Sequence, residues 1–411
     1  MAERSVEFLL VGGGLAAANC SRHLREQGAE GEILIVGREP DPPYNRPPLT
    51  KTYLRGEESR EDILFRPDEW YAEQRIDLLT RTSVTSLDVD TRTAKLSNKD
   101  EVRFEKALLA TGSNVRILRA EGAQLDGIHY LRTVRNSDAL RAEAANSERV
   151  ALIGGSYIGT ELAASFTMLG QQCELIMLES VTLEGFYGAE VGRYFQDTLS
   201  SHGVRVHGSQ ELERFEGSGD RVERIVTKSG LEIECDFVVI GAGVTPDIML
   251  AQRAGLETGS GVIVDRFLES SAPGVYAAGD IAEYDSVIHD RRLRIEHWDV
   301  AFNQGKYAAL NMLGQQREYD VVPYFWSDLG DWTSMEYVGP ASEWDEIWVR
   351  GSIDEGKFTA FYVHGTRLAA ALTVGRSDDL TVAARLLKEK TDVSGLRERL
   401  EDVNTDIAEL G

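Results

Sequence analysis

Near its start the chain reads Phe8-Leu9-Leu10-Val11-Gly12-Gly13-Gly14-Leu15-Ala16-Ala17, an apolar strand followed by a glycine turn and the start of a helix. Residues 150–159 repeat the pattern as Val-Ala-Leu-Ile-Gly-Gly-Ser-Tyr-Ile-Gly. Glycines at such a turn let the backbone approach a pyrophosphate, and the amino end of the helix stabilises its negative charge. Two such turns in one chain predict a protein that holds two dinucleotides, as hydride exchange between a flavin and a nicotinamide requires.

The composition predicts a water-soluble enzyme of more than one domain. The 411 residues exceed what one hydrophobic core organises, so two or three domains are expected. No apolar run approaches the ~20 residues of a membrane span, and the first residues show no signal-peptide pattern. The 44 basic and 68 acidic residues give a net charge of −24, which repels nucleic acid and anionic membranes. We therefore expect a cytoplasmic protein with no nucleic-acid or membrane partner.

The three cysteines, Cys20, Cys173 and Cys235, are scattered through the chain and form no CxxC pair. This usage favours a reducing compartment and argues against a disulfide framework or a zinc site. Cys20 falls in the first predicted helix and Cys173 starts a predicted strand, so both are interpreted as small buried hydrophobes. No metal site is expected.

The elements follow one another in an order that is typical of two βαβ units and a third, smaller part. Proline excludes residues 40–48 from regular helix and from a central strand, which predicts a loop held in one shape. Short alternating strands are predicted over residues 76–109, and a further apolar run ends in Gly279-Asp280. After about residue 325, segments rich in aromatic residues precede a charged helical tail, which predicts a small α+β domain.

In this order the chain resembles the FAD-dependent pyridine nucleotide oxidoreductases. More closely, it resembles the ferredoxin reductases of bacterial oxygenase systems and the flavoprotein part of apoptosis-inducing factor. The resemblance covers nearly the whole chain. The motifs that carry it are Arg46-Pro47-Pro48-Leu49-Thr50-Lys51, Ala110-Thr111-Gly112, Leu131-Arg132-Thr133, residues 154–161 with Glu161 at the end, Gly279-Asp280, Arg294-Ile295-Glu296-His297-Trp298 and Tyr324-Phe325-Trp326-Ser327-Asp328.

The resemblance implies an α/β fold with two Rossmann-like dinucleotide-binding domains and a C-terminal α+β cap. The expected FAD-binding domain is discontinuous, over residues 1–115 and 242–323. The NAD-binding domain is expected over residues 116–241 and the cap over residues 324–411. The residues expected to bind the cofactors are Gly12, Gly14, Leu15, Ala16, Ala17, Arg38, Glu39, Arg46, Lys51, Val84, Ala110, Thr111, Gly112, Arg132, Gly154, Ser156, Tyr157, Ile158, Gly159, Glu179, Ala242, Gly243, Gly279, Asp280, Glu296, His297, Trp298 and Trp326.

Two positions decide which nucleotide each turn takes. In the family an acidic residue after the second strand contacts the FAD ribose, and here Arg38 stands at that position with Glu39 beside it, so either could make the contact. In the second unit Ser156 replaces the middle glycine, and Glu179 ends the next strand. A carboxylate there accepts hydrogen bonds from the ribose hydroxyls and repels a 2′-phosphate. No arginine follows it in Ser180-Val181-Thr182, so the sequence predicts NADH rather than NADPH.

The resemblance also places Lys51 and Glu161 together beside the flavin as the two catalytic residues. A buried cation there would favour the electron-rich reduced ring. His297 and Trp298 are expected along the ring, and Trp326 is expected to shield it. No cysteine stands in the loop of residues 46–51, where disulfide reductases of the superfamily carry theirs. Electrons are therefore expected to leave the flavin directly.

The function that this predicts is NADH-dependent reduction of a 2Fe–2S ferredoxin that serves an oxygenase, by a monomer or homodimer. Two alternatives remain: an NADH oxidase or quinone reductase, and a slowly turning redox sensor like apoptosis-inducing factor. Ferredoxins are acidic, so the docking site is sought in a local basic patch, and Arg291, Arg292 and Arg294 form the candidate. The alternative for these arginines is pairing with the acidic residues around them.

Overall fold

The computed structural model describes residues 3–410, which divide into two compact units. Unit 1 comprises the chain up to Asn45, Arg60–Asn114 and Thr245–Tyr324. Unit 2 comprises Arg46–Ser59, Val115–Val244 and the chain from Phe325 onward. The three predicted domains, with their boundaries near residues 115, 241 and 323, stay a prediction. In the described part of the chain, no helix is long and apolar enough to cross a bilayer.

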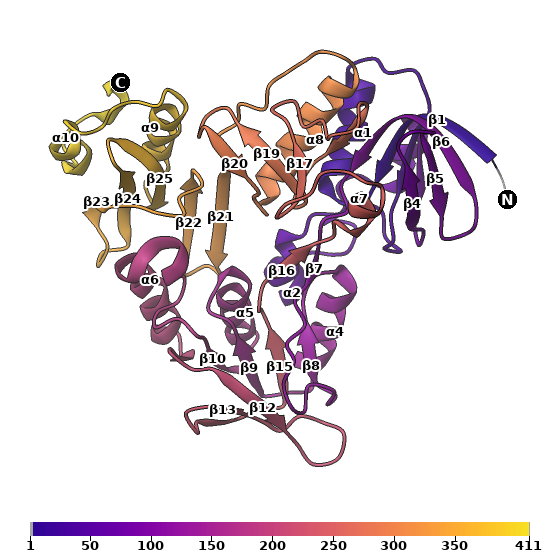
Figure 1. The fold of residues 1–411 in the computed structure, drawn as a ribbon. Helices are drawn as coiled ribbons and strands as arrows, with labels where there is room; N and C mark the ends of the chain where they lie inside the picture. The colour runs from indigo at the N-terminus through magenta and orange to yellow at the C-terminus, as the bar shows by residue number, and fades with distance from the viewer. Residues whose placement is uncertain (1–2, 411) are drawn as a thin grey trace. The chain divides into compact units, whose positions relative to one another are not determined.

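Unit 1 is built on a mixed sheet with strand order β3-β2-β1-β6-β5-β4, to which β18 adds beside β6 (Figure 1). Its central strands β1, β2, β3, β6 and β18 run parallel, and β4, β5 and β6 pair antiparallel. The bounds are β1 Glu3–Val11, β2 Ile33–Val36, β3 Ile76–Leu79, β4 Val84–Asp88, β5 Thr93–Leu96, β6 Glu101–Leu109 and β18 Val275–Ala277. All four residues of β2 are buried, as expected for a parallel strand covered on both faces.

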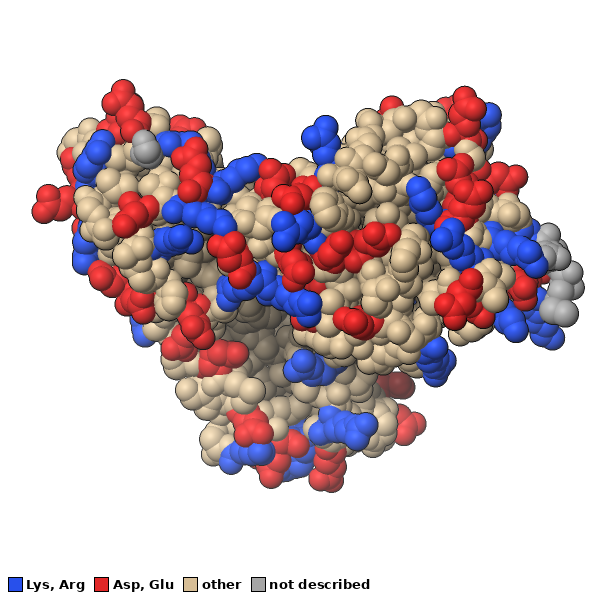
Figure 2. All heavy atoms as spheres, turned by 45° about the horizontal axis from the view of Figure 1, so that its top comes forward, with Lys and Arg blue, Asp and Glu red and all other residues tan. Residues whose placement is uncertain are grey.

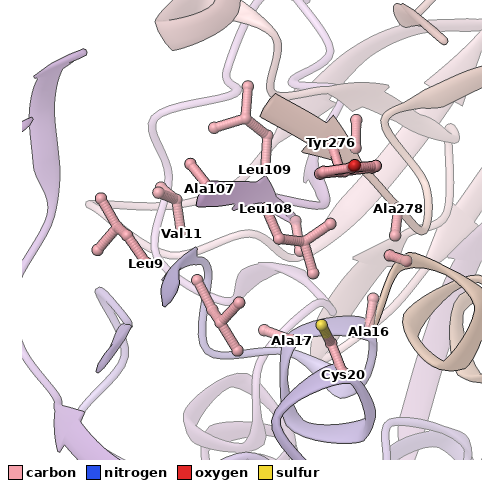
Figure 3. Close-up of a cluster of buried hydrophobic side chains, with 14 of the residues drawn as sticks. Leu9, Val11, Ala16, Ala17, Cys20, Ala107, Leu108, Leu109, Tyr276 and Ala278 are labelled. Carbon is pink, nitrogen blue, oxygen red and sulfur yellow. The ribbon is translucent and has the colours of Figure 1, made fainter. Parts of the chain in front are cut away.

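The helices of unit 1 cover this sheet. They are α1 (Leu15–Glu26), α3 (Asp68–Glu73), α7 (Met249–Arg253) and α8 (Trp298–Met312). A second sheet pairs β17 (Val262–Val264), β19 (Ala282–Ser286) and β20 (Arg291–Leu293). Small residues let α1 and α8 approach closely, because a Cβ on Gly305 would lie only 2.4 Å from the Ala16 carbonyl oxygen. Figure 3 shows the core beneath α1, where Leu9, Ala17 and Cys20 lie with Leu108 in one buried cluster.

Unit 2 contains a five-stranded parallel sheet with order β11-β10-β9-β15-β8. The strands are β8 (Ile128–Tyr130), β9 (Arg149–Ile153), β10 (Gln172–Ile176), β11 (Arg205–His207) and β15 (Phe237–Ile240), and β12 (Leu212–Glu216), β13 (Arg224–Thr227) and β14 (Glu232–Glu234) form a small antiparallel sheet. Its helices are α4 (Val134–Ala144), α5 (Tyr157–Met168) and α6 (Glu184–Ser201). The chain passes between the units through β7 (Ser113–Val115) and β16 (Val244–Pro246).

The last part of unit 2 is an antiparallel sheet of order β21-β22-β25-β24-β23 with helices after it. The bounds are β21 Tyr324–Leu329, β22 Thr333–Val338, β23 Glu346–Ser352, β24 Lys357–His364, β25 Arg367–Val374, α9 Ser377–Lys388, α10 Arg397–Glu401 and η2 Ile407–Glu409. The proline-rich loop ends in a 3-10 turn, η1 (Pro47–Thr50), followed by α2 (Thr52–Arg55). The two sheets with parallel strands and the α+β tail agree with the fold class expected from the sequence.

Candidate functional site

The first glycine turn, Gly12–Gly14, joins β1 to α1, and the backbone shape at Gly12 requires glycine. Gly12 has φ +127°, and a Cβ there would lie 2.1 Å from the Ala110 carbonyl oxygen. Gly14 is the N-cap of α1, it has no side-chain cap, and the first turn of the helix holds no acidic residue. The amides at this helix end and their positive dipole are therefore left for an anion, which fits a pyrophosphate.

Both candidates for the FAD ribose contact already have protein partners. Arg38 donates to the Asp247 carboxylate at 3.1 Å and to Asn114 Oδ1 at 2.6 Å. Glu39 accepts a 2.5 Å hydrogen bond from the Tyr44 hydroxyl. Thr111, also predicted from the sequence, donates to the Asp247 carbonyl at 2.6 Å. The structure thus ties Arg38 and the 110–112 turn together through Asp247, a residue that sequence reasoning missed.

The Gly279-Asp280 turn is held by α8. Gly279 has φ +80°, and its amide donates to Gln304 Oε1 at 2.8 Å. The Nε2 group of Gln304 is buried with no protein partner among the described residues. Arg294 donates to the Asp280 carbonyl at 3.0 Å. This buried donor belongs to the side chain that holds the Gly279 amide, and it fits a polar chain of a cofactor.

His297 and Trp298 open α8 in the same unit. Trp298 donates to Asn45 Oδ1 at 3.0 Å, and its ring stacks on Phe302 with centroids 5.0 Å apart. Burial lowers the pKa of His297 to about 4, against a smaller opposite effect of Asp280. The imidazole is therefore neutral at pH 7. Glu296, the third predicted residue here, accepts a hydrogen bond from Arg294.

The second glycine turn, Gly154–Ser156, repeats these features in unit 2. Gly154 has φ +115°, and a Cβ there would lie 2.5 Å from the Gly241 carbonyl oxygen. A Cβ on Gly159 would lie 1.8 Å from the Gly154 carbonyl oxygen, so the helix packs directly on the turn. Ser156 is the N-cap of α5, yet its side chain makes no cap hydrogen bond and the first turn carries no acidic residue. This helix end also fits a pyrophosphate.

Tyr157, the first residue of α5, lies in an aromatic cluster of unit 2. Its hydroxyl is 2.7 Å from the Tyr187 hydroxyl. Its ring centroid lies 4.7 Å from that of Phe186 and 4.4 Å from that of Phe325. Burial raises its pKa, so the hydroxyl stays protonated.

Lys51 and Glu161, 110 positions apart in the sequence, form an ion pair in unit 2. Lys51 Nζ lies 3.3 Å from a Glu161 carboxylate oxygen, and both residues are buried. Sequence reasoning missed the groups that surround the pair. Lys51 also binds Asp328 at 2.9 Å, and Glu161 accepts hydrogen bonds of 2.6 Å from both Thr50 and Ser327. The loop, α5 and β21 thus meet at one buried carboxylate.

Two further predicted residues, Arg46 and Arg132, are in contact in unit 2, where the Arg46 side chain donates a hydrogen bond to the Arg132 carbonyl. The remaining predicted residues fall as follows: Leu15, Ala16 and Ala17 in the first turns of α1, Val84 at the start of β4, Ala110 and Gly112 after β6, Ile158 in α5, Glu179 exposed after β10, Ala242 and Gly243 after β15, and Trp326 within β21.

Arg292 and Arg294 of the expected docking patch pair with acidic residues. Arg292 binds Asp285 at 3.0 Å, and both side chains are about half exposed. Arg294 binds Glu296 and the Asp280 carbonyl and is mostly buried. Arg291 is exposed on β20.

These features define the chain as an α/β protein with two glycine turns built for dinucleotides. The model of the pyridine nucleotide-disulphide oxidoreductase family matches residues 6–305, and that of the reductase C-terminal domain matches residues 324–411. The chain therefore belongs to the pyridine nucleotide-disulphide oxidoreductase family, whose cofactors are FAD and NAD(H).

Its relatives include reductases that match over the full length. A probable ferredoxin reductase of Castellaniella defragrans is 33% identical over 98% of both chains. The crystal structure of a ferredoxin reductase for the CYP199A2 system of Rhodopseudomonas palustris superposes with a TM-score of 0.94, at 32% identity over 98% of this chain and 99% of that one. The structure of a covalent putidaredoxin reductase–putidaredoxin complex also gives 0.94, at 30% identity over 98% of this chain and 97% of that one.

Proposed function

We propose that this protein is an NADH-dependent ferredoxin reductase that holds FAD at the first glycine turn and NADH at the second. Bound FAD supplies a ring that accepts two electrons together and releases them one at a time. The proposed acceptor is a 2Fe–2S ferredoxin that serves an oxygenase. The observation that carries the proposal is the pair of uncapped helix ends behind two glycine turns, in a chain whose cysteines are all buried.

The cysteines argue for direct electron transfer to a carrier. Cys20, Cys173 and Cys235 are each at most 2% exposed. Burial raises the pKa of Cys173 and of Cys235 to about 12, so neither is a thiolate at pH 7. A buried neutral thiol is a poor nucleophile. The disulfide chemistry in the name of the family therefore has no residues to perform it here.

The roles proposed for the site residues combine their contacts with the roles that the family resemblance implies. Lys51 supplies a fixed positive charge toward the flavin, and Glu161 holds it in place. Gln304 fixes the Gly279-Asp280 turn, and α8 presents its amino end from Trp298. Glu179 contacts the ribose of NADH and selects against a 2′-phosphate.

The test is steady-state turnover with purified 2Fe–2S ferredoxins and NADH. The expected result is one FAD per chain, no FMN, and a turnover with at least one ferredoxin that exceeds turnover with oxygen or quinones. Faster turnover with quinone or oxygen would favour the oxidase or quinone reductase. Slow turnover with every acceptor would favour the redox sensor, and either result would contradict the proposal.

A further inference from the structure

The loop after Glu179, the residue expected to contact the ribose of NADH, carries a second carboxylate. Glu184, the first residue of α6, turns back onto this loop. One of its carboxylate oxygens accepts hydrogen bonds from the Ser180 amide at 3.0 Å, the Ser180 hydroxyl at 2.7 Å and the Val181 amide at 3.2 Å. Three donors of the loop thus converge on one carboxylate.

The position of this loop is fixed by the second glycine turn. The Leu183 amide donates to the Gly155 carbonyl at 2.9 Å, and Val181, Thr182 and Leu183 are buried. Leu183 adopts a left-handed backbone with φ +58°, and the chain enters α6 from there. The three donors therefore lie in the loop that the Gly155 carbonyl holds beside the proposed pyrophosphate site.

Two adjacent amides and a hydroxyl are the kind of donor set that binds a phosphate in the absence of another acceptor. In a βαβ unit the acidic residue at the end of the second strand contacts the ribose 2′-hydroxyl, so a phosphate on that hydroxyl would lie beside the residues that directly follow the acid. Here Ser180 and Val181 are those residues. Their hydrogen bonds lower the pKa of Glu184, as does the charge of Arg193, so the carboxylate is ionised at pH 7.

We propose that Glu184 is a second specificity-determining residue, which occupies the 2′-phosphate site of the loop with its own carboxylate and so excludes NADPH. This inference rests on the proposed function, because it takes the second glycine turn to be the NADH site. It assigns two separate effects to two residues. Glu179 repels a 2′-phosphate across the ribose, and Glu184 occupies the donors that would bind it.

The experiment measures binding of ADP-ribose and of 2′-phospho-ADP-ribose to the FAD-loaded protein by calorimetry. In Glu184→Ala the Kd for 2′-phospho-ADP-ribose is expected to fall about tenfold or more, because the three donors and Arg193 become available. The Kd for ADP-ribose is expected to change less than twofold. Glu184→Gln retains an acceptor oxygen without the charge, so its effect is expected to be intermediate.

Glu190→Gln provides the matched control, because Glu190 is exposed on the same helix and its change removes the same charge. It should leave both ligands unaffected. The ratio of kcat/KM for NADH over NADPH, with ferricyanide as the acceptor, should fall with Glu184→Ala in parallel with the binding ratio. An equal weakening of both ligands would mean that Glu184 only holds the loop, and an unchanged 2′-phosphate ligand would also overturn the inference. If ADP-ribose does not bind the wild-type protein at all, the proposed NADH site itself is wrong and the inference falls with it.

Discussion

At the scale of single residues, Lys51 differs from an ordinary buried cation because it has two carboxylate partners. Glu161 is buried, whereas the Asp328 side chain is about one-third exposed. Glu161 receives two hydroxyl hydrogen bonds besides the lysine, which compensates the cost of burying its charge. The pair is thus a network in which each member depends on the others.

Replacing Lys51 with methionine is expected to destabilise the FAD-loaded protein by about 3 kcal/mol, because the change leaves a buried carboxylate without its cation. The flavin potential should also fall, since a positive charge that favours the reduced ring is lost. Urea unfolding and a redox titration measure the two effects. Asp328→Asn is the control, with an expected cost below ~1 kcal/mol because that pair is partly exposed. A flavin potential that is unchanged in Lys51→Met would mean that the charge of Lys51 does not act on the flavin.

His297 gives a prediction about pH. Its pKa is about 4 in the folded protein, against about 6.5 in an unfolded chain. The unfolded state therefore binds a proton between these values while the folded state does not, so the stability of the protein rises with pH in this window. We expect the urea midpoint to fall as the pH decreases from about 6.5 toward 4. The fall should be smaller in His297→Asn, and an equal fall in both proteins would contradict the assignment.

At the scale of elements, two glycines of the first turn, Gly12 and Gly14, allow the effect of the turn on folding to be separated from its effect on cofactor binding. In Gly12→Ala the new Cβ would collide with the backbone at Ala110, so the turn must open. In Gly14→Ala the Cβ has no neighbour within 4 Å, and φ is an ordinary −97°. The protein should therefore fold with alanine at Gly14, but a cofactor that passes close to the backbone there would be displaced.

The expected result is that Gly12→Ala lowers the melting temperature even of the flavin-free protein. Gly14→Ala should leave the flavin-free protein unchanged and weaken FAD binding at least tenfold. Melting curves with and without added FAD measure both effects. An FAD affinity that is unchanged in Gly14→Ala would mean that the pyrophosphate does not bind at the amino end of α1.

The elements that sequence reasoning predicts well are those whose signal is local. The apolar strands, the glycine turns and the helices that follow them lie where the motifs of residues 8–17 and 150–159 predict them, because strand burial and glycine sterics act over a few positions. The partners of Glu161 could not be predicted in this way. Thr50, Ser327 and Glu161 come from three distant segments, and no periodicity relates them. The resemblance supplied Lys51 and Glu161, but the role proposed for Glu184 required the path of the loop after Glu179.

At the scale of the whole molecule, the charge of −24 opposes an acidic ferredoxin. Lysine, arginine, aspartate and glutamate are interspersed over the face drawn in Figure 2, so no broad basic surface offsets this charge there. Attraction must come from a local site. Arg291 and Arg292, the exposed arginines of β20, remain the candidate docking site. Arg294 is held by Glu296 and the Asp280 carbonyl, so we interpret its role as structural.

The last prediction concerns Arg291 and Arg292. The pair of Arg292 with Asp285 is half exposed and therefore weak, so a carboxylate of a partner could replace Asp285. Reversing both charges in Arg291→Glu with Arg292→Glu should raise the KM for ferredoxin about tenfold and flatten its dependence on ionic strength, because screening acts on the attraction that is lost. Turnover with ferricyanide and NADH should stay unchanged, since the change leaves the proposed cofactor residues intact. Arg266→Glu is the matched control, because it reverses the charge of another exposed arginine of unit 1 that pairs with a glutamate. Arg266→Glu changes the net charge by two units and the double variant by four. A shift in log KM half as large in Arg266→Glu would therefore mean that net charge and not β20 governs docking, and an unaltered KM in the double variant would place the docking site elsewhere.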